Sequence, residues 1–341
     1  SDTEGTYSTE QTTSTTVTTK APKTTSTTVK TTKKTTAAPQ TTEMITREPG
    51  TILPVEALSE KDVAAHKYID LWRTAEVPYN NNILKPMTPA IVPYVVEGSD
   101  RAVIIFPGGG YFQVSMTGEG TDIAEAYNKQ GISAFVVYYR ANSNKVYKKE
   151  AMLADAQRAV QTVRYYADSF GIDKNKIAVC GFSAGGHLTA DLAAEWQNIE
   201  EITGKKLNCK PLAVGLSYAV ISAKTGYAGS HENLLQGYTE EATTELLKKL
   251  NLDEAVSENT PPAFIWTTAE DDCVPSENSL LYALQLAKRK IPYELHVYPQ
   301  GHHGASTCDM EVNAENAWLK RNSRWLDDCA CFFRLFTKEK F

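Results

Sequence analysis

Between Arg101 and Tyr298, short apolar runs alternate with segments in which apolar residues recur every three or four positions. The apolar runs predict buried β-strands, at Arg101–Phe106, Ile132–Tyr139, Ile177–Gly181, Leu212–Val220, Ala263–Thr268 and Tyr293–Tyr298. The periodic segments predict helices, over Thr121–Lys129, Lys148–Phe170 and Ala184–Trp196. Strands that alternate with helices are typical of an α/β protein, in which helices cover both faces of a mainly parallel sheet.

Other regions extend this predicted fold at both ends. Upstream, Pro78–Gly98 contains the strand-like run Ile91–Val96 and predicts antiparallel strands at the start of the sheet. Downstream, Ala223–Thr260 is longer than an ordinary connection, and it predicts a cap or insert with a short helix over Thr243–Leu250. The pattern then predicts one helix marked by Leu280, Leu281, Leu284 and Ala287, and a final helix that carries Trp318, Trp325 and Leu326.

The first 42 residues, Ser1–Thr42, differ in composition from the rest of the chain. Nineteen of them are Thr and four are Ser, so the segment cannot bury enough apolar surface to offset its ordering entropy. It is therefore predicted to be a disordered linker, followed by a single domain over residues 43–341. The chain starts without an initiator Met or a signal peptide, and we expect it to be a mature or excised part of something longer.

Charge and composition argue against a nucleic-acid partner, a membrane span and a cofactor. The whole chain has a net charge of −6, and the linker carries five Lys against three carboxylates, so the remainder carries about −8. An acidic body argues against a nucleic-acid partner. No run of 18 apolar residues is present, so no membrane span is expected. No CxxC pair is present either, and no metal or other cofactor is expected.

The sharpest motif is the G-x-S-x-G pentapeptide Gly181–Gly185, with Ser183 at its centre. A predicted strand ends just before it, and a predicted helix begins just after it. In this context the chain turns tightly at the serine, and the hydroxyl is held clear of the backbone above the N-terminus of the helix. A Gly/Ser turn without function is the alternative, but the flanking strand and helix favour a nucleophilic serine.

A second glycine-rich segment, Pro107–Tyr111 (PGGGY), follows an earlier predicted strand. A serine that attacks an acyl carbon requires preorganised backbone N–H groups to stabilise the oxyanion. We expect one from Ala184, directly after the nucleophile, and another from Gly109 or Gly110, where the lack of side chains permits close approach. A phosphate-binding loop is the alternative, but neither G-x-G-x-x-G nor the Walker pattern fits.

Candidates for an acid and a base follow the last two predicted strands. Asp271 and Asp272 compete for the carboxylate that orients an imidazole, and Asp271, nearer to the strand end, is preferred. His302 and His303 lie between two glycines in a loop that can deliver a general base to Ser183, and His303 is preferred.

The order Ser183, Asp271 and His303, with a glycine-rich loop upstream, resembles that of the α/β-hydrolase fold. The details are similar to its carbohydrate-esterase branch, the acetyl-xylan and feruloyl esterases of plant-cell-wall degradation. The similarity extends from about Pro49 to Trp325. Its specific marks are PGGGY (Pro107–Tyr111), GFSAGGH (Gly181–His187), PPAF (Pro261–Phe264), DDCVPSENS (Asp271–Ser279) and the pair His303-Gly304.

The resemblance also implies roles for single residues. In relatives the triad acid lies four residues before the proline of a V-P step, which corresponds to Asp271, and the base directly precedes a glycine, which corresponds to His303. The chain departs from the pattern in two places. It has His302 where many relatives have Gly, and Pro107 where related esterases often carry His, a change that leaves the backbone donors in place.

The implied activity is that of a secreted serine esterase that removes acyl groups, with acetyl preferred, from xylan or a related plant polysaccharide. A feruloyl esterase is the nearest alternative, because Tyr111 and Phe112 beside the glycine-rich loop could bind an aromatic acyl group. A lipase is disfavoured because Ala223–Thr260 contains no large apolar lid, and a prolyl-type peptidase because no gating domain is present. A non-catalytic carbohydrate-binding or scaffold relative is the alternative of another class, against which the intact Ser/Asp/His set counts.

The Thr-rich linker is similar to the linkers between modules of extracellular polysaccharide-degrading enzymes. This similarity implies adjoining carbohydrate-binding or docking modules as partners, and a place in a larger modular or cell-surface enzyme complex.

Overall fold

The computed structural model describes residues 65–72, 77–80, 87–143, 145–196, 208–225, 229–309 and 316–336. The chain divides into two units, Ser1–Thr41 and Thr42–Phe341. All of the described residues belong to the second unit. The linker predicted over Ser1–Thr42, and the start of the domain at residue 43, lie outside the described residues and stay predictions.

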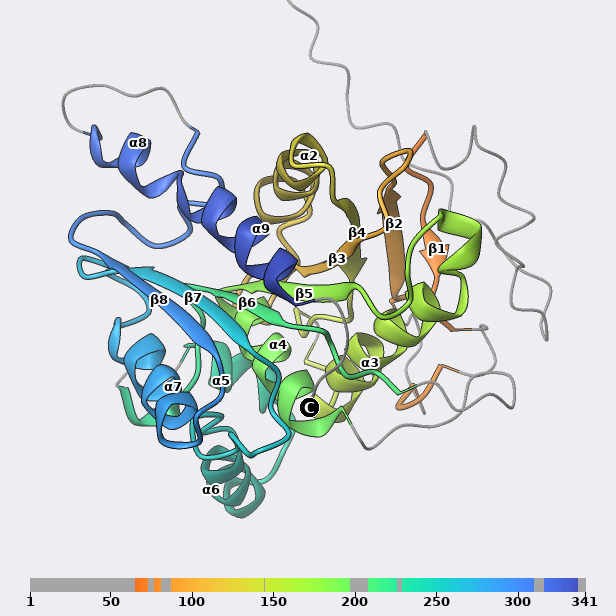
Figure 1. Ribbon diagram of the computed structural model, residues 1–341. Coiled ribbons are helices and arrows are strands. Elements are labelled where there is room, and N and C mark those ends of the chain that lie inside the picture. The colour runs from red at the N-terminus through yellow and green to blue at the C-terminus, as the bar shows by residue number, and fades with distance from the viewer. Residues whose placement is uncertain are drawn as a thin grey trace, which may run out of the picture. The chain divides into compact units, whose positions relative to one another are not determined.

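The described part of the chain contains one eight-stranded sheet (Figure 1). From one edge to the other, the strands are β1 (Ile69–Asp70), β2 (Ala90–Tyr94), β4 (Ser133–Tyr138), β3 (Ala102–Phe106), β5 (Ile177–Phe182), β6 (Val214–Ser217), β7 (Ala263–Thr268) and β8 (Tyr293–Tyr298). The pairs β1–β2 and β2–β4 are antiparallel, and every other neighbouring pair is parallel. The predicted mainly parallel sheet with antiparallel leading strands is thereby confirmed.

Helices lie against both faces of the sheet, as predicted (Figure 1). One face carries α3 (Lys149–Tyr165), α4 (Ala184–Glu195) and α7 (Glu277–Lys288), and the other carries α2 (Asp122–Lys129), α8 (Trp318–Asn322) and α9 (Trp325–Leu335). Because both faces are covered, the inner strands β3, β5 and β7 are buried at every position. This double burial explains why these strands are continuous apolar runs in the sequence rather than alternating ones.

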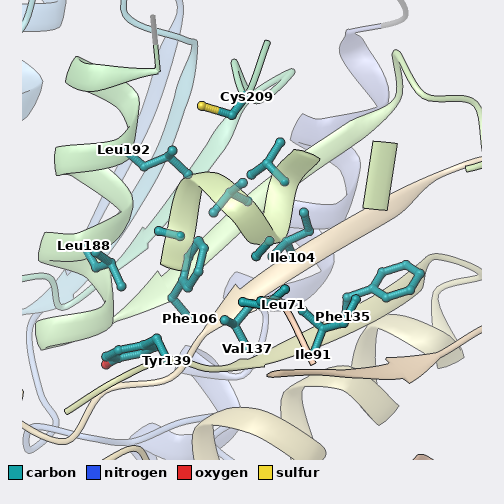
Figure 2. Packing of buried hydrophobic residues seen from close by; sticks show 14 of the residues in the cluster. Leu71, Ile91, Ile104, Phe106, Phe135, Val137, Tyr139, Leu188, Leu192 and Cys209 are labelled. Atoms are coloured by element: carbon teal, nitrogen blue, oxygen red, sulfur yellow. The ribbon is translucent and has the colours of Figure 1, made fainter. Parts of the chain in front are cut away.

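A core of apolar side chains fills the space between the sheet and the helices α3 and α4 (Figure 2). Phe106 from β3 and Phe135 from β4 pack there with Leu188 and Leu192 of α4. A second cluster on the opposite face contains Trp325 and residues of α2 and α9. Burial of this kind stabilises the fold by about 25 cal/mol per Å² of apolar surface removed from water.

Several predicted boundaries are wrong, and backbone geometry gives the reason. The strand predicted over Leu212–Val220 is shorter, because Tyr218 has a φ of 36° and turns the chain out of the sheet. The helix predicted over Lys148–Phe170 ends at Tyr165, and a separate 3₁₀ turn (Asp168–Phe170) precedes Gly171, whose φ is 69°. The single final helix is in fact the two helices α8 and α9.

The long segment between β6 and β7 contains more helix than predicted. It includes α5 (Gly229–Leu234) and α6 (Glu240–Lys249), where the sequence predicted one helix over Thr243–Leu250. The hydroxyl oxygen of Thr239 accepts a hydrogen bond from the Ala242 amide (3.3 Å) and so caps α6. Within the described residues, no helix combines the length and the apolarity needed to cross a bilayer.

Candidate active site

Ser183 lies at a tight turn between β5 and α4, as the G-x-S-x-G motif predicted. Its φ and ψ are 52° and −118°, a conformation that few residues other than glycine adopt. A Cβ atom on Gly181 would lie 2.2 Å from the Gly185 carbonyl oxygen, and one on Gly185 would lie 2.1 Å from the Phe106 carbonyl oxygen. Both glycines are therefore required for the close approach that presents Ser183 at the end of the strand.

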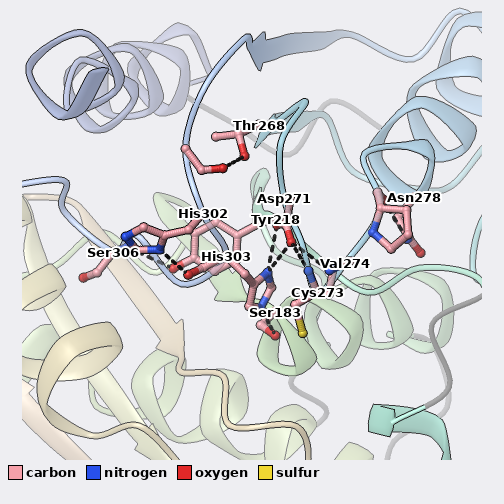
Figure 3. Close-up of polar contacts among 12 residues, drawn as sticks. Ser183, Tyr218, Thr268, Asp271, Cys273, Val274, Asn278, His302, His303 and Ser306 are labelled. Atoms are coloured by element: carbon pink, nitrogen blue, oxygen red, sulfur yellow. Dashed lines mark hydrogen bonds and ion pairs between the residues drawn. The ribbon is translucent and has the colours of Figure 1, made fainter. Parts of the chain in front are cut away.

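The three predicted triad side chains lie within hydrogen-bond distance of one another (Figure 3). Nε2 of His303 is 2.8 Å from Oγ of Ser183, and Nδ1 of His303 is 2.8 Å from Oδ2 of Asp271. Because the carboxylate can only accept, Nδ1 carries the proton and Nε2 is left free to accept the Ser183 hydroxyl proton. The arrangement can therefore activate a serine as a nucleophile.

Asp271 is held in place by the backbone that follows it. Its Oδ1 accepts hydrogen bonds from the amides of Cys273 (3.0 Å) and Val274 (2.7 Å), and its side chain is 1% exposed. These bonds fix the position of the carboxylate just after the end of β7. The neighbouring Asp272 is exposed.

His302, the other candidate base, does not face Ser183. It is exposed, and its Nδ1 lies 2.7 Å from the carbonyl oxygen of His303. Its ring packs edge-on against Trp318 instead, with the ring centroids 5.3 Å apart. The structure thus brings His303, and not His302, to the nucleophile.

The glycine-rich loop lies beside Ser183, where an oxyanion would form. Gly109 and Gly110 have φ values of 125° and 65°, and a Cβ on Gly109 would lie 2.2 Å from the Gln113 carbonyl oxygen. Within the described part of the chain, the amides of Gly109, Gly110 and Ala184 donate to no protein group. They are therefore available to a developing negative charge, at a place where the N-terminus of α4 adds its dipole.

Ser183 and His303 share one open pocket with the glycine-rich loop, and its volume is about 340 Å³. Its lining comprises Gly109, Gly110, Gln113, Ser115, Gly118, Glu119, Ser183, Cys273, His303, Gly304 and Ser306. Across the described ranges, no group of three or more His, Cys, Asp or Glu residues is arranged to hold a metal ion.

Tyr111 and Phe112, predicted to bind the acyl group, do not line this pocket. The Tyr111 side chain is buried (1% exposed), and its hydroxyl group is 2.8 Å from Nδ1 of His187 in α4. A φ of 57° turns this residue into the interior, so its ring offers no surface to a substrate. Phe112 is 51% exposed and is not among the residues that line the pocket. A substrate contact by Tyr111 is therefore ruled out by its burial.

Two polar side chains beside the site carry no clear signal in the sequence. Glu119 lies in the pocket and accepts a hydrogen bond from the Gly108 amide (2.8 Å). Asn233, in α5, donates from its side-chain amide to the Gly110 carbonyl oxygen (2.9 Å). Both contacts join segments far apart in the sequence, and no local pattern marks them.

Several known proteins are similar to this chain in sequence, in fold or in both. Residues 91–286 match the BD-FAE family. The chain is 33% identical over 248 residues to endo-1,4-beta-xylanase B of Butyrivibrio fibrisolvens, which covers 71% of this chain and 38% of that protein. It is 30% identical over 236 residues to the acetylxylan esterase of Xylanibacter ruminicola, which covers 67% of this chain and 44% of that protein. The chain therefore spans less than half the length of either relative.

Solved structures show the same architecture. The crystal structure of an acetyl ester-xyloside bifunctional hydrolase from Caldicellulosiruptor lactoaceticus superposes with a TM-score of 0.69 at 34% identity, over 79% of this chain and 96% of that one. The carboxylesterase Cest-2923 from Lactobacillus plantarum superposes with a TM-score of 0.60 at 22% identity, over 76% of this chain and 97% of that one, which shows the fold alone. Because the family match covers more than half of this chain, the chain belongs to the BD-FAE family. Its sheet topology is that of the α/β-hydrolase fold.

Proposed function

We propose that this protein is a serine carboxylic-ester hydrolase that removes acetyl groups from xylan or a related plant polysaccharide. The observation that carries the proposal is the chain of 2.8 Å contacts from Ser183 through His303 to Asp271, at the edge of an open pocket. The same contacts count against a non-catalytic carbohydrate-binding or scaffold role, for which such an arrangement has no use.

In the proposed mechanism, His303 accepts the Ser183 proton at Nε2 while Oγ forms a bond to the ester carbonyl carbon. The amides of Ala184 and of Gly109 or Gly110 stabilise the oxyanion, and Asp271 stabilises the imidazolium. The C–O bond to the sugar then breaks, and the sugar oxygen takes the proton from Nε2. Water then gives a proton to Nε2 of His303 and attacks the acyl carbon. The bond between that carbon and Oγ of Ser183 breaks, Oγ takes the proton from Nε2, and the acid leaves.

The choice of an acetyl group rests on the pocket and on the relatives. The lining offers small and polar side chains, and the Tyr111 ring, which could have stacked on a hydroxycinnamate, is buried. Two of the similar proteins are named for acetyl-ester or acetylxylan hydrolysis. Feruloyl-ester hydrolysis is the alternative within the same chemistry.

A product assay tests the substrate. Acetylated xylan and a feruloylated arabinoxylan fragment are incubated with the protein and with Ser183→Ala, and the released acids are quantified. Acetate release that is lost in Ser183→Ala supports the proposal. Ferulate release without acetate assigns the alternative acyl group, and release of neither acid contradicts the substrate class.

We further propose that the protein acts outside the cell, next to carbohydrate-binding or docking modules. The Thr-rich composition of Ser1–Thr42 supports this, as does the chain's span of 38% and 44% of two longer relatives. Fractionation of the native source organism, with detection of the full-length protein in the culture medium or on the cell surface, tests the location.

A further inference from the structure

Glu119 is a buried carboxylate within the pocket that the triad mechanism leaves without a role. It lies in the π-helical turn Thr117–Thr121, is 7% exposed, and lines the same pocket as Ser183 and His303. Burial raises its pKa, while hydrogen bonds from Tyr218 and Gly108 oppose the rise. A buried carboxylate costs stability unless its oxygen atoms find partners, and π-helical turns are frequent at functional sites.

One oxygen atom of Glu119 holds the start of the glycine-rich loop. Oε2 accepts a hydrogen bond from the amide of Gly108 (2.8 Å), the residue directly before the two glycines that line the pocket. A Cβ on Gly108 would lie 2.6 Å from Oε2 of Glu119 and 2.9 Å from Cβ of Ser183. The loop therefore passes between the carboxylate and the nucleophile, and Glu119 fixes its position relative to Ser183.

The other oxygen atom connects to the histidine. Oε1 accepts a hydrogen bond from the Tyr218 hydroxyl group (2.7 Å), and the Tyr218 ring packs against the His303 ring with centroids 4.9 Å apart at 70°. The Tyr218 oxygen also accepts from the Ser306 amide (3.2 Å), in the loop that follows His303. Figure 3 shows Tyr218 together with His303 and Ser306. Glu119 is thus joined to the histidine loop through a single side chain.

We propose that Glu119 is a positioning residue that holds the glycine-rich loop and the histidine loop in register around Ser183. The inference rests on the proposed esterase activity and assigns a further residue to it. Both tethered groups act on the transition state, because the loop amides meet the oxyanion and His303 transfers the proton. Loss of the tethers therefore lowers kcat rather than raising KM.

The test uses p-nitrophenyl acetate, which reports acyl transfer without any assumption about the natural polysaccharide. We expect Glu119→Ala to lower kcat by about 10- to 100-fold, the loss typical of a small misplacement of reacting groups, with KM changed by less than about threefold. Glu125→Ala, which removes an exposed carboxylate from α2, is the matched control and should leave both constants unchanged.

Glu119→Gln separates tethering from charge. A glutamine can accept from the Gly108 amide with its oxygen and donate to the Tyr218 oxygen with its amide group. We expect this variant to recover kcat to within about fivefold of the wild type, since it keeps the contact with Gly108 and reverses the contact with Tyr218, whose hydroxyl proton alone loses its acceptor. A glutamine variant as slow as the alanine variant would overturn the tethering role, because the carboxylate charge would then be the essential feature.

Tyr218→Phe tests the path to the histidine, since it keeps the ring against His303 and removes the hydroxyl group. Combined with Glu119→Ala, it should cost less than the sum of the two single losses, because both changes break the same network. Additive losses would contradict the proposed connection. Equal melting temperatures of wild type and Glu119→Gln provide a folding control for the series.

The outcomes also separate this inference from the activity on which it rests. A wild type that neither hydrolyses the ester nor reacts with a fluorophosphonate at Ser183 removes the esterase proposal, and the role of Glu119 falls with it. An active wild type with Glu119→Ala within twofold of its kcat removes the positioning role alone.

Discussion

The side-chain amide of Asn233, in α5, donates to the carbonyl oxygen of Gly110 across 2.9 Å. The Asn233 carbonyl oxygen in turn accepts from the side chain of Asn142 (2.9 Å), so α5 is joined to the body of the domain at this point. Besides its predicted role as a cap, the segment between β6 and β7 therefore also supports the glycine-rich loop at the site.

Asn233→Ala is expected to lower kcat for p-nitrophenyl acetate by about three- to tenfold, the equivalent of one lost hydrogen bond. The reason is that Gly110 loses its anchor and its amide is less well aimed at the oxyanion. Steady-state kinetics measures the change, with Glu232→Ala, an exposed residue of the same helix, as the control. An unchanged kcat in Asn233→Ala would show that the loop holds its shape without α5.

Asp271→Asn is expected to lower kcat by about 10⁴-fold, as removal of the orienting carboxylate does in known Ser-His-Asp enzymes. An asparagine cannot stabilise the imidazolium, and it favours the wrong tautomer of His303. Asp272→Asn is the matched control, because Asp272 is exposed and the change removes the same charge one position along the chain. Comparable losses in both variants would refute the assignment of the acid to Asp271.

Gly108→Ala is expected to abolish most of the activity, by about 100-fold or more in kcat. Its new methyl group would lie 2.6 Å from Glu119 and 2.9 Å from the Ser183 Cβ, so the loop must move away from the nucleophile. At Gly118, by contrast, an added Cβ meets nothing within 4 Å, and Gly118→Ala should remain active. Kinetics on both variants, with circular dichroism to verify folding, decides whether the close approach matters.

The buried ion pair between Arg140 and Asp155 predicts a large effect on stability. Two contacts of 2.8 Å join the guanidinium to the carboxylate, and both side chains are fully buried. Asp155→Ala leaves a buried charge without its partner and should lower the free energy of unfolding by about 3–5 kcal/mol. Urea denaturation measures it. Glu245→Ala, which breaks an exposed pair with Lys248, should leave the free energy of unfolding nearly unchanged.

Asp191, buried in α4, predicts how stability depends on pH. Burial raises its pKa from 3.8 to about 6. Between about pH 4 and pH 6 the folded state holds a proton that the unfolded state has released, so this residue lowers stability as the pH rises. Asp191→Asn removes this pH dependence. The change that the substitution causes in the free energy of unfolding should be about 2–3 kcal/mol more favourable at pH 8 than at pH 4.

Urea denaturation at the two pH values measures this difference. Asp168→Asn, at an exposed position, is the control and should behave like the wild type at both. A gain of equal size at pH 4 and pH 8 would mean that the buried charge is not its cause.

The sequence predicted the sheet and the strand–turn–helix around Ser183 because both depend on local signals, namely apolar runs and closely spaced glycines. It placed Asp271 and His303 for a related reason: both follow the ends of parallel strands, which meet at one edge. Tyr111 could not be placed in this way, because a positive φ in a loop decides whether its ring points inward or outward. Glu119 was missed because its partners, Gly108 and Tyr218, become neighbours only in the folded chain.

Ser183, Asp271 and His303 lie within five residues of the ends of the parallel strands β5, β7 and β8. The distances among them are therefore set by the spacing of neighbouring strands and not by the lengths of the connections between those strands. Segments such as the one from β6 to β7 can therefore change in length during evolution while the triad atoms keep their places, provided that a contact like that of Asn233 with Gly110 is kept. A protein with this scaffold can thus change the substrate that it recognises by altering loops while the triad stays the same.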